Sequence, residues 1–531
     1  MRIIRSEKKL VLNPTLLPML LGTIVIVVCA TLDGVGKNNL FHIVIFWILL
    51  SSFVRHFQDS KFLRLLPGRF LLALVLSLST SISLALNYFY GSGLSYGFAE
   101  SVLGTNISEA LSILKVLWPS TFIFVFTFIL YWHAFGKSAP PTRFKKKIFT
   151  SALILYLSLM ILDAFILQPK NAKAGVRYSS FSKFISRTPA YNFSKFIDAQ
   201  EMIAEIKGAT ASKFLPTYNL GQSDGHQNIL IIIGESARRD RWSIYGYHRD
   251  TSPNLISIKD ELIVVKEAIS PAAYTLLAVP LSLSHIAADA NDILHQRYNS
   301  IIDLANHLGY VTHWISFQGK MAIDNTSITA HANKSKFIQW ASGHDGAAVS
   351  ILRNLLLKSE EKKFIIIHLN GSHEDPCDRL PEKKVLIKGL DHQDDCYDST
   401  ILHTDKLIHD LIHLMKGSNN STLVYYSDHG LIKQKGEFLH ANGIPPKSVL
   451  DIPFFVWSNN PSFKNRSRTE GQISGEYSLL NNYFLFSHLM GIEISGAECL
   501  SILKACYPKS DKLFAYDTSG KMHNYSDLPS H

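Results

Sequence analysis

Apolar residues follow two different patterns along the chain, and the pattern changes near residue 170. In the first part they form five continuous runs, at about residues 16–32, 40–54, 70–90, 118–135 and 148–168. A bilayer core is spanned by about 20 helical residues, with a range of about 17–25, so four runs are long enough and the second is short unless its flanks join it. Residues 1–170 are therefore predicted to form an α-helical membrane domain of five transmembrane helices.

From residue 226 to residue 531 the apolar runs are shorter and alternate with stretches of helical periodicity. The strand-like runs lie at 229–233, 262–265, 310–315, 364–368, 422–426 and 452–457, and the helical stretches include 298–308, 346–358 and 399–416. Such alternation is typical of a layered α/β fold with a mainly parallel sheet. The second part is therefore predicted to be a separate α/β domain.

Residues 171–225 mix short apolar groups with polar ones and form a predicted linker. Its apolar residues Phe193, Phe196, Ile197, Ile203 and Ile206 recur at roughly helical spacing. A helix of this kind can lie on a membrane surface, or it can pack on the α/β domain as an ordinary amphipathic helix. Both interpretations stay open.

The loop between the third and fourth apolar runs, at about residues 91–117, carries two further candidates. Asn106 and Glu109 lie within an otherwise apolar, helix-like stretch from Leu103 to Leu117. Polar groups near a membrane face can contact lipid headgroups, and they can equally be solvated loop residues. Asn106 and Glu109 are therefore candidate substrate-binding residues.

Basic residues set the orientation of the predicted helices, because Lys and Arg in short loops resist translocation. The loops on one side of the five runs hold 13 of them and the loops on the opposite side hold only Lys37 and Lys115. This places the N-terminus in the cytoplasm and the α/β domain outside. The net charge of +10 comes largely from these loops, so no nucleic-acid partner is expected.

Cysteine placement agrees with an external α/β domain. Cys29 lies in an apolar run, whereas the other four cysteines fall in the predicted α/β domain. An even number of external thiols suits two disulfides, most simply Cys377–Cys396 and Cys499–Cys506. A structural zinc site is the alternative, although the sequence has no C-x2-C pair.

Three of the predicted strands end in side chains that can bind a metal ion. The run 229–233 stops at Gly234-Glu235-Ser236, the run ending at Tyr426 is followed by Ser427-Asp428-His429-Gly430, and a third ends at His368 with His373 close behind. Open α/β sheets build their sites at strand ends, and zinc accepts carboxylates and imidazoles while keeping an open position. Taken singly, Glu235 could equally be a charge at the N-terminus of a helix. Asp428-His429-Gly430 could equally form a turn.

A hydroxyl group that could act as nucleophile lies outside these strand ends. Thr275 follows Ser270-Pro271-Ala272-Ala273-Tyr274 at the predicted start of a helix, where backbone amides favour an anionic phosphate. Metal coordination can make such a hydroxyl nucleophilic. Taken alone, Thr275 would be read as an N-cap residue.

Several ordered motifs together resemble those of the membrane phosphoethanolamine transferases of Gram-negative bacteria. They are Ile233 to Asp240 with Tyr245-Gly246-Tyr247 and Thr251-Ser252-Pro253, Thr275 with Val279-Pro280, His368-x4-His373, Tyr425 to Gly430, and His440. The resemblance covers nearly the whole chain, including five membrane helices before a periplasmic domain. It implies an alkaline-phosphatase or sulfatase-like fold and a multi-pass protein of the bacterial inner membrane with a periplasmic catalytic domain.

The resemblance also implies roles for individual residues. Zinc would be bound by Glu235, Thr275, Asp428 and His429, and Thr275 would become phosphorylated. His373 and His440 resemble histidines that contact the transferred phosphate or a second zinc. Gln318 and Lys320 fall where the family places headgroup-binding residues, although the lipid A-modifying branch usually has an Asn-Ser pair where this chain has Gln318-Gly319.

The reaction implied by the resemblance is transfer of phosphoethanolamine from phosphatidylethanolamine to a hydroxyl, through phosphothreonine and with release of diacylglycerol. The motifs look most like those of the branch that modifies periplasmic glucans, so the expected acceptor is an envelope glycan, either periplasmic glucan or lipopolysaccharide. The alternatives are a lipid A-specific transferase, a glycerophosphate transferase or sulfatase-like hydrolase, and a catalytically inactive membrane sensor. A sulfatase would need Cys or Ser followed by x-Pro-x-Arg, which Thr275 lacks.

Overall fold

The computed structural model describes most of the chain and divides it into two compact units. The described residues are 16–57, 68–105, 118–136, 143–167, 179–201, 212–221, 225–287, 296–318, 326–357, 361–460, 472–508 and 513–530. Unit 1 comprises Met1–Leu94, Ile113–Ala172 and Arg177–Asp198, and unit 2 comprises Ser95–Ser112, Lys173–Val176 and Ala199–His531. The two units are described separately below.

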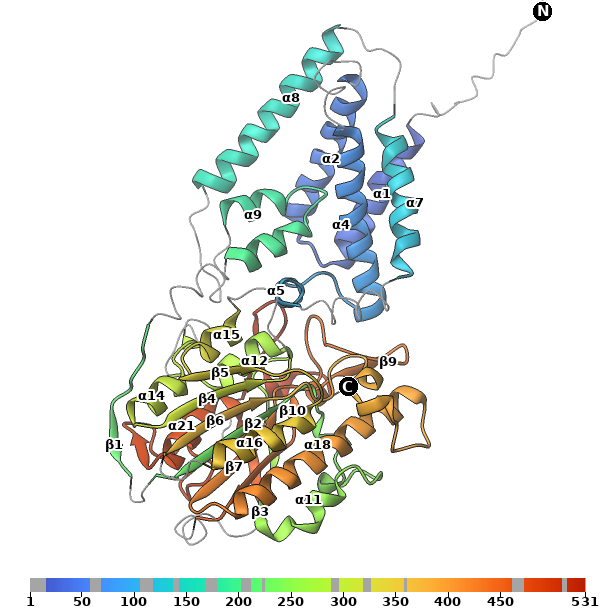
Figure 1. Ribbon diagram of the computed structural model, residues 1–531. Helices are drawn as coiled ribbons and strands as arrows, with labels where there is room; N and C mark the ends of the chain where they lie inside the picture. The colour runs from blue at the N-terminus through green and yellow to red at the C-terminus, as the bar shows by residue number, and fades with distance from the viewer. Residues whose placement is uncertain are drawn as a thin grey trace, which may run out of the picture. The chain divides into compact units, whose positions relative to one another are not determined.

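Unit 1 contains an apolar helix at each of the five predicted runs (Figure 1). These helices are α1 (Leu17–Leu32), α2 (Lys37–Phe57), α4 (Gly68–Tyr90), α7 (Ser120–Ala134) and α8 (Arg143–Leu162), and a π-helical turn, Asp163–Leu167, extends α8. Among the described residues three spans are long and apolar enough to cross a membrane: Lys37–Arg55, Gly68–Tyr90 and Lys147–Ile166. The residues on either side of the short second run are also helical, which makes this span long enough. Helices α1 and α7 are apolar but shorter than the three candidate spans. Five helices are present, but five spans are not established.

Small and polar side chains hold the helices of unit 1 together. The Trp47 indole donates a hydrogen bond of 3.0 Å to Thr23 Oγ1, and the Tyr131 hydroxyl lies 2.8 Å from Thr80 Oγ1. A Cβ at Gly22 would lie 2.8 Å from the Trp47 ring. Close approach at glycine and interhelical hydrogen bonds are the usual contacts of helices in a lipid environment.

Unit 2 is built on a nine-stranded sheet. In spatial order its path is β10 (Asp451–Ile452), β3 (Leu262–Ile269), β11 (Phe454–Ser458), β7 (Ser421–Ser427), β2 (Asn228–Gly234), β6 (Lys363–His368), β4 (Val311–Ser316) and β5 (Phe337–Trp340), with β12 (Gln472–Ser478) beside β3. The strands from β7 to β5 are parallel, but β11 is antiparallel to both of its neighbours. The sheet is therefore mixed, and the prediction of a mainly parallel sheet describes the half that carries the candidate site.

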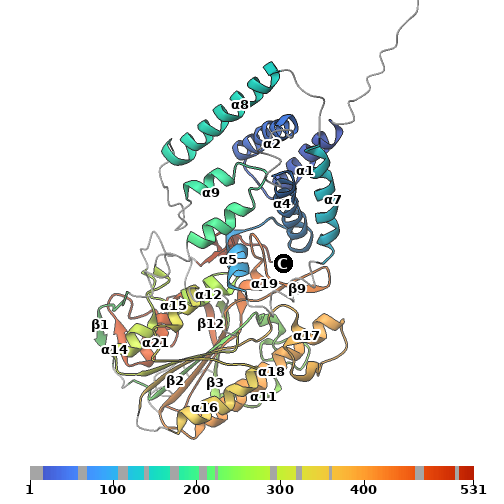
Figure 2. The ribbon, with the colours of Figure 1, turned by 45° about the horizontal axis from the view of Figure 1, so that its top comes forward.

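Helices cover both faces of this sheet, as Figures 1 and 2 show. Side chains of β2 alternate between two cores, with Ile229, Ile231 and Ile233 in one and Leu230 and Ile232 in the other. The first core includes α12 (Thr275–Ser282), α14 (Ile301–His307), α15 (Ser327–Ala332) and α21 (Asn482–Leu489), and the second includes α11 (Pro253–Ser257), α16 (Ala348–Leu356) and α18 (His392–Lys416). Burial on both faces explains why β2 is a continuous apolar run.

Helix α5 (Tyr96–Gly104), from the loop between α4 and α7, belongs to unit 2. Its first turn is capped by Ser95, whose hydroxyl accepts from the Phe98 amide. The Gly97 amide donates a hydrogen bond of 2.6 Å to the Thr518 carbonyl, and a Cβ at Gly97 would lie 2.7 Å from Tyr274 Cζ. A segment between two apolar helices thus packs beside the residue that precedes Thr275.

The predicted linker is divided between the units. Helix α9 (Ser180–Ile185) and a helix beginning at Phe193 group with unit 1 up to Asp198. In unit 2, β1 (Tyr218–Leu220) pairs antiparallel with β13 (Ile492–Ile494). Ile203 and Ile206 lie outside the described residues, and the interfacial position of this helix stays a prediction.

Candidate active site and metal centre

Glu235, Asp428 and His429 meet at the carboxyl ends of two adjacent parallel strands. Gly234 of β2 pairs with Ser427 of β7, so the residues that follow the two strands emerge side by side. All three side chains are almost completely buried, at 1%, 0% and 0% exposure. Their candidate ligand atoms all lie within 4.8 Å of one another. The structure thus brings together residues that are 193 positions or more apart in the sequence.

The donor set fits a divalent cation such as zinc. Asp428 Oδ2 is buried and has no hydrogen-bond partner among the described residues. Burial raises the pKa of Glu235 and the neighbouring Asp428 carboxylate raises it further, so the ionised form of Glu235 is disfavoured without a nearby positive charge. A cation between them would remove this penalty. Two carboxylate oxygens with one imidazole nitrogen are ligands that zinc accepts.

The ring of His429 is oriented for such a role. Its Nδ1 lies 2.9 Å from the Gly430 carbonyl, which can only accept, so Nδ1 carries the proton. In the neutral ring the other nitrogen, Nε2, then carries the lone pair that can bind a metal ion. It lies 3.4 Å from Asp428 Oδ2 and 3.6 Å from Glu235 Oε1. A backbone carbonyl that fixes the tautomer is a common partner of metal-binding histidine.

The Thr275 hydroxyl lies against the same group of ligands. Thr275 Oγ1 is 3.1 Å from Glu235 Oε2, 3.3 Å from Oε1 and 3.1 Å from His429 Nε2. Thr275 is the first residue of α12, and Tyr274 before it is extended. Thr275 is therefore not the N-cap, a position that Tyr274 occupies, and its role as a nucleophile stays a prediction.

Tight backbone contacts hold Glu235 in place. Ser236 has a positive φ of 60°. Its amide donates a hydrogen bond of 3.0 Å to Asp428 Oδ1, and its hydroxyl donates one of 2.5 Å to Glu235 Oε1. Gly371 also has a positive φ, of 51°, and a Cβ there would lie 2.7 Å from the Glu235 carbonyl oxygen. The left-handed conformation of Ser236, a non-glycine residue, is a form of backbone strain that is characteristic of functional sites.

His373 and His440 form a second group beside these ligands. Their ring centroids are 4.8 Å apart, and those of His429 and His440 are 5.2 Å apart. Ligand atoms of Glu235, His373 and His440 also lie within 4.8 Å of one another. The arrangement therefore leaves both predicted roles open for these histidines, contact with a phosphoryl group or binding of a second metal ion.

The two histidines have opposite electrostatic environments. Burial lowers the pKa of His440, but the charge of Glu374 and its hydrogen bond outweigh this effect and raise the pKa to about 9. Glu374 Oε1 accepts from His440 Nδ1 at 2.7 Å and from its backbone amide at 2.6 Å. Burial, followed by the charge of Arg379, holds the pKa of His373 well below its usual range. His440 is thus a cation and His373 a neutral imidazole near pH 7.

Gln318 reaches the site, and the other predicted substrate-binding residues cannot be placed. Gln318 Nε2 donates a hydrogen bond of 2.6 Å to Glu235 Oε2 and one of 3.1 Å to the Leu369 carbonyl. It therefore contacts a candidate metal ligand, a contact that was not anticipated for a headgroup-binding residue. Lys320, Asn106 and Glu109 lie outside the described residues.

Glu374 and Arg379 were not predicted from the sequence. Glu374 directly follows His373, so a carboxylate beside a candidate histidine was a signal that could have been used. Arg379 Nη2 lies 3.2 Å from His373 Nδ1, and the guanidinium also donates to the Glu374 carbonyl. Because arginine only donates, His373 Nδ1 accepts and its Nε2 carries the proton.

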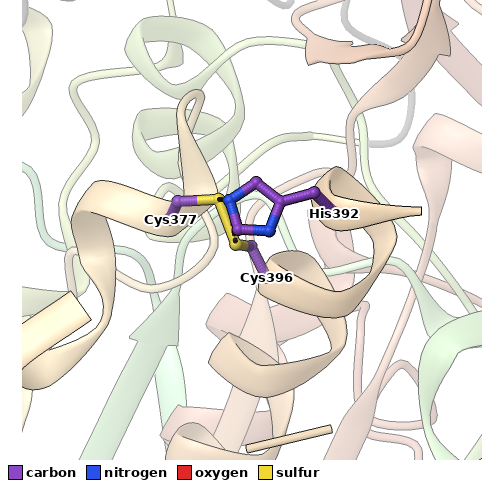
Figure 3. Close-up of side chains that lie close together, drawn as sticks. All are labelled: Cys377, His392 and Cys396. Carbon is purple, nitrogen blue, oxygen red and sulfur yellow. Dashed lines mark hydrogen bonds between the residues drawn. A yellow bond between two sulfur atoms is a disulfide. The ribbon is translucent and has the colours of Figure 1, made fainter. Parts of the chain in front are cut away.

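A disulfide braces the segment that carries these residues. Cys377 of α17 (Pro376–Arg379) is bonded to Cys396 of α18, and Cys499 is bonded to Cys506, as predicted. The His392 ring lies over the first bridge, with Nε2 3.5 Å from Cys377 Sγ and 3.9 Å from Cys396 Sγ (Figure 3). The bridge ties α17, and with it Arg379, to the long helix α18.

Comparisons with known proteins identify the family of the chain. The sulfatase family model matches residues 227–492, which is half of the chain, and the model described as "Transferase YhbX N-terminal domain" matches residues 7–206. The chain is 29% identical to the putative transferase YhbX of Escherichia coli K12 over 442 residues, 80% of each protein. It is 26% identical to the phosphoethanolamine transferase EptA of Helicobacter pylori over 445 residues, 79% of this chain and 81% of EptA.

The fold of the whole chain has a solved counterpart. The integral membrane lipooligosaccharide phosphoethanolamine transferase A of Neisseria meningitidis superposes with a TM-score of 0.62 at 19% identity, over 93% of this chain and 97% of that protein. At this identity the match shows the fold alone. The chain belongs to the sulfatase family, and within it groups with the phosphoethanolamine transferases that its motifs resemble.

Proposed function

We propose that this protein transfers phosphoethanolamine from phosphatidylethanolamine to a hydroxyl of an envelope glycan, through phosphothreonine at Thr275. The observation that carries the proposal is the position of Thr275 Oγ1, 3.1 Å from both Glu235 Oε2 and His429 Nε2. A threonine hydroxyl held between a buried carboxylate and an unprotonated imidazole nitrogen is arranged to lose its proton. The relative named phosphoethanolamine transferase EptA supports the choice of transferred group.

Glu235, Asp428, His429 and Thr275 would hold zinc, which when bound favours the Thr275 alkoxide and offsets negative charge on the transferring phosphoryl group. The remaining chemistry belongs to the side chains around it. His373 has its Nε2 proton free to donate to a phosphoryl oxygen, because Arg379 occupies Nδ1. His440 supplies a positive charge held in place by Glu374.

In the first half-reaction Thr275 Oγ1 forms a bond to phosphorus and the bond from phosphorus to the diacylglycerol oxygen breaks. The Thr275 proton passes to the Glu235 carboxylate, whose Oε2 lies 3.1 Å from Thr275 Oγ1. The departing diacylglycerol oxygen takes a proton from the His440 imidazolium, which general acid catalysis requires of a poor leaving group. The products are phosphoethanolamine-threonine and diacylglycerol.

In the second half-reaction the acceptor hydroxyl forms the new bond to phosphorus and the bond to Thr275 Oγ1 breaks. His440, now neutral, takes the acceptor proton and returns to its cationic form. Thr275 recovers its proton from the Glu235 carboxyl group. One histidine thus acts first as acid and then as base, and protons balance over the cycle.

A lipid donor explains the apolar helices of unit 1. We place the protein in the bacterial inner membrane with a cytoplasmic N-terminus and a periplasmic unit 2, supported by the asymmetry of basic loops and by the two disulfides. Periplasmic glucan and lipopolysaccharide sugars are then the accessible acceptors. The same placement would suit the alternative acceptor, lipid A.

The test uses the purified full-length protein in detergent with fluorescent phosphatidylethanolamine. Diacylglycerol release and a phosphoethanolamine adduct at Thr275, detected by peptide mass spectrometry, are expected. Thr275→Val should abolish both, whereas Thr275→Ser, which keeps the hydroxyl, should retain measurable release. Unchanged release by Thr275→Val, with zinc content unchanged, would exclude Thr275 as the nucleophile.

A further inference from the structure

A second cavity lies at the carboxyl edge of the parallel strands, separate from the candidate metal ligands. Its volume is about 200 Å³, and it lies between the segment after β5, the segment after β6 and helix α18. His344 and Asp345 come from the first segment and Gly371 and Arg379 from the second. Crevices outside the carboxyl ends of parallel strands are where open α/β sheets bind their ligands.

Helix α18 lines this cavity with one face. Thr400, His403, Thr404 and Leu407 all line it, and their spacing of three and four residues places them on one helix face. His403 Nε2 is buried and has no hydrogen-bond partner among the described residues. Burial, His344 and Lys406 lower the pKa of His403, so the ring is neutral near pH 7 and can donate from one nitrogen and accept at the other.

The charges around the cavity are balanced. Arg379 and Lys406 bring positive charge, and Asp345 and Asp410 bring negative charge. Lys406 Nζ is 2.7 Å from Asp410 Oδ2, and the two Asp345 oxygens accept from the amides of Asn370 and Gly371. Two carboxylates in the wall would repel a phosphate group. Intermixed donors and acceptors instead suit a ligand rich in hydroxyl groups, which can donate and accept at once.

The size and the apolar parts of the wall narrow the class of ligand. Val349, Pro381 and Leu407 provide apolar surface beside the polar groups, which matches the C–H face of a sugar ring. A volume of about 200 Å³ is many times the roughly 10–15 Å³ that a cavity needs to hold one water molecule. The cavity therefore has room for a single sugar ring.

The cavity shares a wall with the candidate active site. The segment 370–379 faces the cavity through Gly371 and Arg379. The same Arg379 lies 3.2 Å from His373 Nδ1, and the same Gly371 packs against the Glu235 backbone. A ligand in the cavity would therefore lie next to the segment that carries His373.

We propose that this cavity binds one sugar residue of the acceptor glycan while a neighbouring hydroxyl of the same glycan reaches phosphorylated Thr275. The inference rests on the proposed function and adds an acceptor subsite to it. The site serves only the second half-reaction, because the lipid donor is consumed before the glycan reacts.

The experiment separates the two half-reactions in the full-length protein. Val349→Trp fills the cavity from α16, and His403→Phe removes the unpartnered imidazole nitrogen. Ser350→Trp is the matched control, because Ser350 is the next residue of α16 and is exposed. Diacylglycerol release from fluorescent phosphatidylethanolamine reports the first half-reaction, and transfer to purified periplasmic glucan or lipopolysaccharide core oligosaccharide reports the second.

Both cavity variants should leave diacylglycerol release and the Thr275 adduct within about twofold of wild type and raise the KM for the saccharide by about tenfold. Equilibrium binding of the same saccharides, measured without donor lipid, should weaken by a similar factor, whereas Ser350→Trp should change neither. Unchanged saccharide KM and binding in both cavity variants would refute the subsite, as would absence of saccharide binding by the wild type. Wild-type binding that the cavity variants lose, without any transfer, would support the subsite and refute the proposed function.

Discussion

Glu374 Oε1 accepts two hydrogen bonds from His440, one from Nδ1 at 2.7 Å and one from the backbone amide at 2.6 Å. This contact fixes the ring beside His373 and His429 and keeps its pKa high, at about 9, despite burial. A carboxylate next in sequence to one histidine thus determines the charge of another histidine 66 residues away.

Replacing Glu374 by Gln should remove the positive charge of His440 near pH 7. If His440 protonates the departing diacylglycerol, kcat for its release should fall by about 10²-fold with little change in donor KM. Glu437→Gln is the control, because Glu437 is an exposed carboxylate three residues before His440. A Glu374→Gln enzyme with wild-type kcat would show that His440 is not the acid.

The contact of Gln318 with Glu235 should strengthen metal binding. Its side-chain amide donates a hydrogen bond of 2.6 Å to Glu235 Oε2. Residues that hydrogen-bond to a metal ligand orient that ligand and contribute about 10- to 100-fold to metal affinity. Gln318→Leu should therefore weaken zinc binding by that factor in a competition titration with a chelator. Gln339→Leu, at an exposed position of β5, should leave the affinity unchanged. Equal zinc affinities of the two variants would limit Gln318 to substrate contact.

The Cys377–Cys396 bridge should matter more for activity than the Cys499–Cys506 bridge. The first bridge closes the longer loop, with a sequence separation of 19 residues against 7 for the second. A disulfide typically stabilises the folded state by about 2–4 kcal/mol, and in the chain-entropy model a longer loop gives a larger stabilisation. The first bridge also anchors α17 and thus Arg379. The double variant Cys377→Ala/Cys396→Ala should lower the thermal midpoint and kcat, and Cys499→Ala/Cys506→Ala should lower both by less. The reverse order would contradict a positioning role for α17.

Glu100 of α5 should make stability depend on pH. Burial raises its pKa to about 7 although Arg297 and Tyr96 act in the opposite direction, whereas an unfolded glutamate titrates near 4.3. The folded state therefore holds the proton more tightly, and stability falls as pH rises from about 4.5 to about 7 and is level above that. Glu100→Gln cannot ionise, so its thermal midpoint should exceed that of wild type by a margin that grows from pH 4.5 to about pH 7 and is constant above that.

The matched control for Glu100 is Glu361→Gln, since Glu361 is exposed. Its midpoint should follow the wild-type curve at every pH. If Glu100→Gln also follows that curve, the Glu100 carboxylate is not buried in the folded protein and the packing of α5 in unit 2 is wrong.

Apolar periodicity was sufficient to predict the main elements. The runs at 229–233, 364–368 and 422–426 became the buried strands β2, β6 and β7, and the long apolar runs became helices. The run 452–457 was read as one strand, but Pro453 separates β10 from β11. The short strand β5 was missed, because its residues 337–339 are exposed at the sheet edge and carry no burial pattern.

The sequence alone determined which side chains follow the strands and that a hydroxyl starts a helix nearby, because strand ends and helix starts are local signals. It could not determine that β7 lies beside β2, since strand order depends on non-local pairing. Nor could it reveal that Glu374 holds His440, that Arg379 borders both the site and a second cavity, or that α5 packs beside Tyr274. These contacts join residues far apart in the chain, and only burial of the common core brings their polar groups within hydrogen-bonding distance.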